Sequence, residues 1–82
     1  MLMRLDGKLL TNAQVQCLLD AVGFNTLATS MHAKGYRLSK IRLPRRFPAS
    51  GRLTIRFVWS ARDDAGHQVT VRMAGTVAVD PA

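Results

Sequence analysis

One stretch in the second half of the chain constrains the fold more than any other. From residue 52 to residue 60, apolar side chains alternate with mostly polar ones, the apolar positions being Leu53, Ile55, Phe57 and Trp59. A period of two is typical of a β-strand that buries one face. A second alternating run, residues 68–79, places Val69, Val71, Met73, Val77 and Val79 on one side. The turn residues between the runs include Gly66, which suits the positive φ of a short loop, so a long β-hairpin is predicted.

Two helices are predicted before this hairpin. Thr11 and Gln14 have the spacing of a capping box, and the apolar positions that follow are Val15, Leu18, Leu19 and Val22. Gly23 is well placed just beyond the end of this helix. A second helix is predicted from Asn25 or Thr26 to Lys34, with an apolar stripe of Phe24, Leu27, Ala28 and Met31.

The first helix also carries small residues on its opposite face, at Ala13, Cys17 and Ala21. Two interpretations stay open for this stripe. It packs inside the fold, which is the preferred interpretation and makes Cys17 an inert buried thiol, or it is the seam of a homodimer.

The remaining segments are shorter. Asp6 and Gly7 form a favoured turn pair, so residues 1–5 are either a strand that leads into the helix or one arm of a small hairpin. Residues 36–43 alternate with a slip in phase, which predicts a strand with a bulge near Ser39 and Lys40. A short third helix ended by Pro44 is the alternative. Residues 44–51 are predicted to be a loop, and Gly75 marks a bulge or a close-packing point in the last strand.

Together these elements predict one domain over residues 1–82 in the α+β class. Two N-terminal helices pack on a small antiparallel sheet that ends in a long C-terminal β-hairpin.

The distribution of charge carries the functional prediction. The chain has a net charge of +7, and between Ala21 and Ala61 it has eight Lys or Arg residues without one Asp or Glu. Concentrated charge of one sign destabilises a compact fold, so an anionic partner is predicted. The preferred partner is nucleic acid, with DNA favoured, because arginine matches the geometry of phosphate. The predicted contact residues are Arg37, Lys40, Arg42, Arg45, Arg46, Arg56 and Arg72.

No enzyme, metal site or cofactor is predicted. His32 and His67 stand alone, and the adjacent carboxylates of Asp63 and Asp64 point apart in a turn. The single cysteine excludes an internal disulfide and fits a reducing compartment. The N-terminus lacks the pattern of a signal peptide, and no apolar run is long enough to span a membrane, so a cytoplasmic location is expected.

Two helices joined by a tight turn at Gly23 and followed by a hairpin resemble helix-turn-helix proteins of the winged type, over residues 11–73. The resemblance implies that residues 25–34 form the recognition helix, with Thr29, Ser30 and His32 facing the bases. The sequence departs from that pattern, because Pro44 obstructs a third helix and acids stand at the wing tip. If DNA is bound, the strands and the 44–48 loop are therefore the preferred contact elements.

A protein partner is the alternative. Small basic αβ proteins of phages and mobile elements, anti-CRISPR proteins included, are similar in size and charge, and they inhibit host protein complexes. This similarity implies that the basic band docks on an acidic protein surface. Aromatic residues and arginine dominate such interfaces, and the candidate anchors are Tyr36, Phe47 and Trp59.

Overall fold

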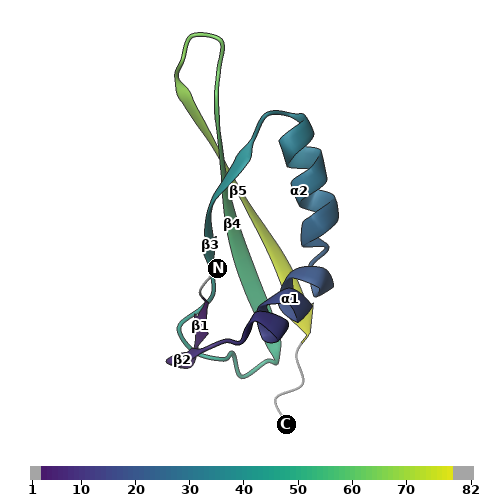
Figure 1. Ribbon diagram of the computed structural model, residues 1–82. Coiled ribbons are helices and arrows are strands. Elements are labelled where there is room, and N and C mark those ends of the chain that lie inside the picture. Colours follow the sequence, from purple (N-terminus) through teal and green to yellow (C-terminus); the bar gives the residue numbers. More distant parts are fainter. Residues whose placement is uncertain (1–2, 79–82) are drawn as a thin grey trace.

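The computed structural model describes residues 3–78 and confirms an α+β domain with two helices and two small antiparallel sheets. The elements are β1 (Arg4–Leu5), β2 (Lys8–Leu9), α1 (Asn12–Ala21), α2 (Phe24–Ala33), β3 (Arg37–Arg42), β4 (Arg52–Arg62) and β5 (Gln68–Ala78). One sheet pairs β1 with β2, and the other has the order β3-β4-β5. Both helices lie on the same face of the larger sheet (Figure 1). They follow the β1–β2 hairpin and precede the larger sheet, so the helices lie in the N-terminal half without being the first elements of the chain.

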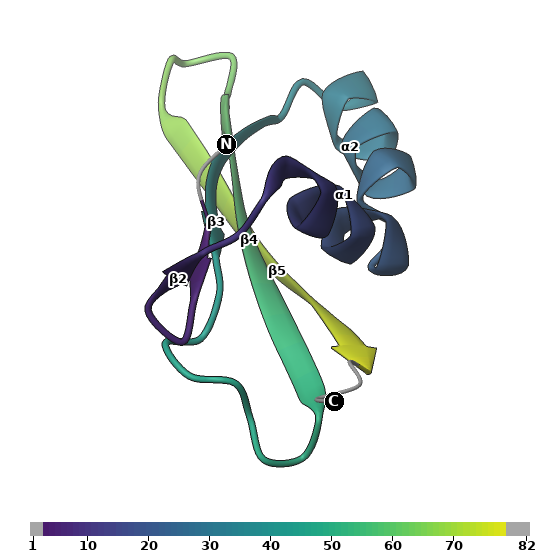
Figure 2. The same cartoon turned by 60° about the horizontal axis from the view of Figure 1, so that its bottom comes forward.

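The β1–β2 hairpin is the second of the two arrangements predicted for the N-terminal segment. Arg4 pairs with Leu9 and Leu5 with Lys8, across a turn in which Asp6 has a φ of 53° and Gly7 a φ of 74°. Asparagine, aspartate and glycine tolerate the left-handed region that such two-residue turns require. The hairpin lies beside the loop that connects β3 to β4 (Figure 2).

The predicted bulge in β3 is confirmed. Leu38 pairs with Trp59, Lys40 pairs with Val58, and the register shifts between them at Ser39. Because Ser39 is left out of the pairing, Leu38 and Ile41 both face the helices despite their odd spacing. The alternative of a short helix in this segment is wrong.

The core lies between the inner face of the sheet and the two helices. Leu53, Ile55 and Trp59 are 0% exposed and Phe57 is 2% exposed, as their alternation predicts. Among residues 3–78, Met3, Val15, Leu19 and Met31 are the other buried apolar residues. Gly75 is a close-packing point rather than a bulge, because a Cβ there would lie 3.0 Å from the Cβ of Val22, and β5 pairs with β4 without a register shift.

The helix ends follow the sequence signals closely. At the start of α1 the amide of Gln14 donates to Thr11 Oγ1 (3.1 Å), and the amide of Thr11 donates to Gln14 Oε1 (2.9 Å). This is the predicted capping box. Gly23 has a φ of 72° between the helices. The second helix begins at Phe24, slightly earlier than predicted, and ends at Ala33.

Three predictions about burial need correction. Ala13, Cys17 and Ala21 are all exposed, so the interpretation that this stripe packs inside the fold is wrong, as is a buried Cys17. Val69 faces the helix side but remains 36% exposed. The tip of the β4–β5 hairpin projects beyond the helix layer, so the helices do not cover the tip (Figure 1). The prediction for Val79 falls outside the described residues.

Candidate anion-binding face

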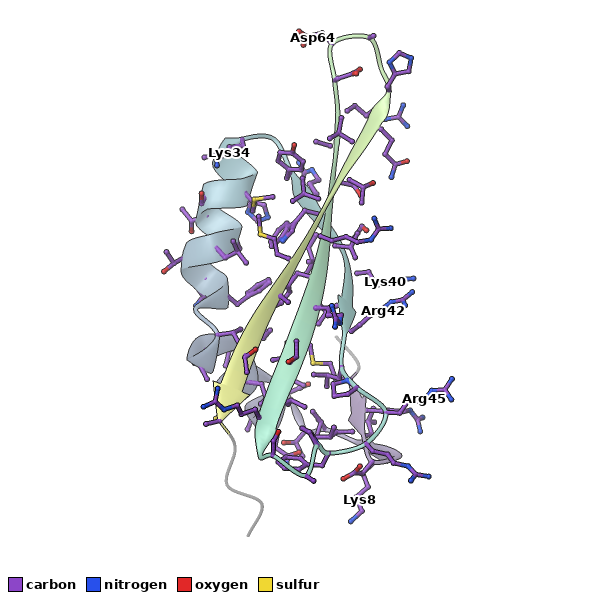
Figure 3. The ribbon with its side chains drawn as sticks, turned by 180° about the vertical axis from the view of Figure 1, so that it is seen from behind. Lys8, Lys34, Lys40, Arg42, Arg45 and Asp64 are labelled. Atoms are coloured by element: carbon purple, nitrogen blue, oxygen red, sulfur yellow. The ribbon has the colours of Figure 1, made fainter. Side chains whose placement is uncertain are left out.

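The outer face of the β3-β4-β5 sheet is the face turned away from the helices. Strand alternation and the pairing register assign the cations of these strands to it. Figure 3 shows two of them, Lys40 and Arg42, on the side of the sheet opposite α2. The seven cations of the outer face are Arg37, Lys40, Arg42, Arg52, Arg56, Arg62 and Arg72, and all are exposed.

The pairing register concentrates four of these cations at the centre of the face. Arg42 lies directly opposite Arg56, and Lys40 and Arg72 both lie opposite Val58, one on each neighbouring strand. Lys40, Arg42, Arg56 and Arg72 together line a hollow of about 420 Å³, with Ser39, Val58 and Ala74 on its walls. All three strands contribute a cation, so the hollow exists only in the folded sheet.

No carboxylate offsets this cluster among residues 3–78. The one ion pair between described residues joins His67 to Asp63 in the turn at the hairpin tip. Like charges placed directly opposite each other destabilise a sheet, by roughly 0.2–1 kcal/mol for a cross-strand pair. The pairing of Arg42 with Arg56 therefore costs stability, and an anion seated between them would offset this repulsion by attracting both guanidinium groups.

The loop between β3 and β4 adds two further exposed cations, Arg45 and Arg46. Two contacts from the β1–β2 turn hold this loop: the amide of Asp6 donates to the carbonyl of Arg45 (3.0 Å), and the amide of Phe47 donates to Asp6 Oδ1 (2.6 Å). Arg45 points to the same side of the molecule as Lys40 and Arg42 (Figure 3). The loop therefore extends the basic surface beyond the end of β3.

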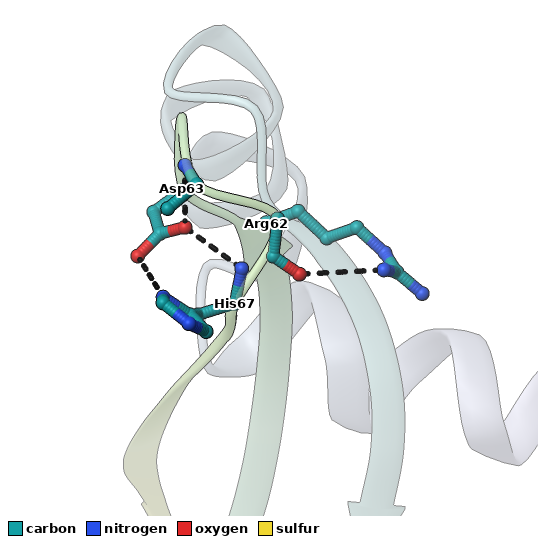
Figure 4. Close-up of polar contacts among 5 residues, drawn as sticks. Arg62, Asp63 and His67 are labelled. Atoms are coloured by element: carbon teal, nitrogen blue, oxygen red, sulfur yellow. Dashed lines mark hydrogen bonds and ion pairs between the residues drawn. The ribbon is translucent and has the colours of Figure 1, made fainter.

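The acids at the hairpin tip do not face this surface as a pair. Asp63 Oδ1 accepts from the amides of Ala65 (3.0 Å) and His67 (2.8 Å), and Oδ2 lies 3.4 Å from His67 Nδ1. Figure 4 shows the Asp63 carboxylate turned toward His67, within its own turn. Asp63 is thus a turn-forming residue, and the carboxylate of Asp64 is exposed at the end of the molecule.

Two predicted contact residues lie elsewhere. Thr29 and Ser30 are exposed on α2, which packs on the inner face of the sheet through Phe24, Leu27, Ala28 and Met31. The Thr29 hydroxyl donates to the carbonyl of Asn25 one turn earlier (2.9 Å). The structure therefore brings the sheet cations together and places Thr29 and Ser30 in the other layer.

Three residues of the site were missed by sequence reasoning. Arg52 and Arg62 belong to the outer face. The alternation of β4 could have predicted this, because both residues are an even number of positions away from Arg56. Asp6 had no such signal, since it holds a loop about forty residues away in the chain. Only the folded structure shows that contact.

The part of the chain that the structure describes has no cluster of metal-ligand side chains and no membrane-spanning helix. No group of three His, Cys, Asp or Glu side chains there could hold a metal ion. No helix among residues 3–78 has the length and hydropathy needed to cross a membrane. Comparison with protein-family models, curated proteins and solved structures gives no match to this chain.

Proposed function

We propose that this protein is a non-enzymatic nucleic-acid-binding protein, with DNA as its preferred ligand, and that it binds through the outer face of the β3-β4-β5 sheet. The observation that supports this most is the hollow lined by Lys40, Arg42, Arg56 and Arg72, with no acid on the same face of the described sheet. Such a cluster lowers the stability of the fold and provides the positive charge that neutralises phosphates on binding. A regulatory role in the cytoplasm fits a small binding protein of this kind.

A winged-helix mode of docking is the competing proposal for how DNA is held. In that mode α2 enters the groove and presents Thr29 and Ser30 to the bases. That surface of α2 offers short hydroxyl side chains, one of which already bonds to the helix backbone. Direct readout relies chiefly on Arg, Lys, Asn and Gln. The sheet face is therefore the preferred docking surface.

Titration of a labelled DNA duplex at several salt concentrations tests the proposal. Log affinity should fall linearly with log salt, with a slope of about −0.9 for each phosphate contacted. The triple variant R42Q/R56Q/R72Q should reduce the magnitude of the slope by up to about 2.7. The matched control T29A/S30A alters the α2 surface and should leave the slope unchanged.

The outcomes separate the proposals. Absence of binding by the native protein even at low salt contradicts a nucleic-acid ligand. Loss of binding in T29A/S30A with normal binding in the triple variant supports docking through α2 instead of the sheet.

The alternative partner, an acidic protein surface, loses one of its predicted anchors in this structure. Trp59 is 0% exposed, and Tyr36 and Phe47 are half-buried. A protein interface built on this face would depend on Lys40 and the arginines, without Trp59 as an aromatic anchor. Salt-sensitive binding to an acidic protein without binding to DNA would favour this alternative.

A homodimer through α1 remains a prediction. The stripe of Ala13, Cys17 and Ala21 is exposed, and the first two line an apolar hollow of about 360 Å³ with Leu5, Leu10, Gln14, Leu18 and Leu53. A two-fold seam along this stripe would bring the Cys17 residues of two copies close together. Mild oxidation would then give a covalent dimer, whereas a protein that stays monomeric before and after oxidation contradicts the seam.

A further inference from the structure

We infer that the ligand of the outer face is a B-form DNA duplex, whose major groove the sheet faces, rather than a single strand or an RNA duplex. This inference rests on the proposed function and narrows it to one form of nucleic acid. Three independent features of the sheet support it: the positions of the aromatic side chains, the length of β4 and the spacing of the cations across the strands.

None of the aromatic residues is available on the outer face for stacking with bases. Phe57 and Trp59 are buried in the core, and Phe24 packs against both, with ring centroids 5.5 and 6.1 Å away. Tyr36 packs against the same core, and Phe47 is half-buried in the loop after β3. Proteins that bind single strands gain roughly 1–3 kcal/mol per base from stacking on aromatic side chains. The outer face offers cations but no exposed aromatic side chain on which bases could stack.

The cations of the outer face extend over a length that suits a stiff ligand. Arg52 and Arg62 are the first and last residues of β4, which pairs with β5 along its whole length without a register shift. Ten residue steps at about 3.3 Å each place them roughly 33 Å apart. A duplex is already ordered and carries about one charge per 1.7 Å of axis, so it fits this row without the ordering cost of a single strand.

The width of the sheet agrees with the major groove. Neighbouring strands are about 4.8 Å apart, so Lys40 and Arg42 on β3 lie roughly 10 Å across the sheet from Arg72 on β5. The major groove of B-form DNA is about 12 Å wide and admits β-strands. Cations on the two outer strands would then reach the phosphates on the two walls of the groove, and Arg56, directly opposite Arg42, would share the phosphate contacts on the β3 side. The major groove of A-form RNA is too narrow and deep for this arrangement.

A competition assay with the native protein tests the inference. A labelled 20-base-pair DNA duplex is displaced by the same unlabelled duplex, by either of its single strands, or by an RNA duplex of the same sequence, at one salt concentration. The unlabelled DNA duplex should compete at least about tenfold more effectively than a single strand or the RNA duplex.

Each other result has a separate meaning. A single strand or RNA duplex that competes as well as the DNA duplex overturns the inference while leaving nucleic-acid binding intact. If the labelled DNA and directly labelled single strands and RNA all fail to bind at low salt, the proposed function itself is overturned.

Discussion

The two faces of β4 separate the residues that hold the fold from those proposed to bind a ligand. On the inner face, Leu53, Ile55 and Trp59 are fully buried beneath the helices. On the outer face, Arg52, Arg56 and Arg62 are exposed. The same strand therefore carries both sets at alternate positions. Substitutions one residue apart on β4 should therefore affect different properties: those on the inner face should lower stability, and those on the outer face should weaken binding.

The largest expected effect is on the inner face. Phe57→Ala removes a buried ring that packs against Phe24, and large-to-small changes of this kind cost about 3–5 kcal/mol. Chemical denaturation should show a large fall in the free energy of unfolding. The matched control, Val58→Ala, alters the next residue, which is only partly buried on the outer face, and should cost much less. Equal losses in the two variants contradict the assignment of faces.

The next effect concerns the contact between the sheet and α1. Gly75→Ala places a Cβ about 3.0 Å from the Cβ of Val22, which forces the helix and strand apart. Overpacking of this kind costs about 1–3 kcal/mol, measurable as a lower denaturation midpoint. Thr76→Ala alters the exposed neighbour on the other face and removes only the hydroxyl contact with Thr54 (3.4 Å), so its effect should stay below about 1 kcal/mol. A Gly75→Ala variant as stable as the native protein would show that this contact is not tight.

A smaller effect is expected where the N-terminal hairpin holds the basic loop. Asp6→Ala removes the acceptor for the Phe47 amide and puts alanine at a φ of 53°, so we expect a loss of about 1 kcal/mol. Asp6→Asn retains an acceptor and tolerates that φ, so it should stay close to native stability. Thermal denaturation of the native protein and both variants measures these differences in stability. If the Asp6→Asn variant loses as much stability as Asp6→Ala, the carboxylate charge matters rather than the hydrogen bond.

Much of the fold was predictable because local patterns determined it. The alternation of Leu53, Ile55 and Phe57 specified the hairpin, and the spacing of Thr11 and Gln14 specified the start of α1. Long-range contacts carried no such pattern. The exposure of Cys17 depends on which face of α1 packs on the rest of the fold, and the contact of Asp6 with the loop joins distant parts of the chain.

The candidate site was predictable in composition but not in extent. The acid-free segment identified Lys40, Arg42 and Arg56 as candidate contact residues. Which side chains of β3 face outward depends on the bulge at Ser39, which the structure shows. The direct pairing of Arg42 with Arg56 depends on that bulge, since a continuous register would have displaced it by one residue. The helix residues Thr29 and Ser30 entered through a family resemblance, and the structure separates them from the cations.

The measurement that tests the central claim most directly combines stability and binding in one variant, Arg56→Gln. Removing one of two like charges that face each other should leave the free energy of unfolding unchanged or raise it by up to about 1 kcal/mol. The same variant should bind duplex DNA more weakly, with a salt slope smaller in magnitude by about 0.9. A variant that loses stability but binds DNA with native affinity and salt dependence would contradict the claim that this cation serves a ligand rather than the fold.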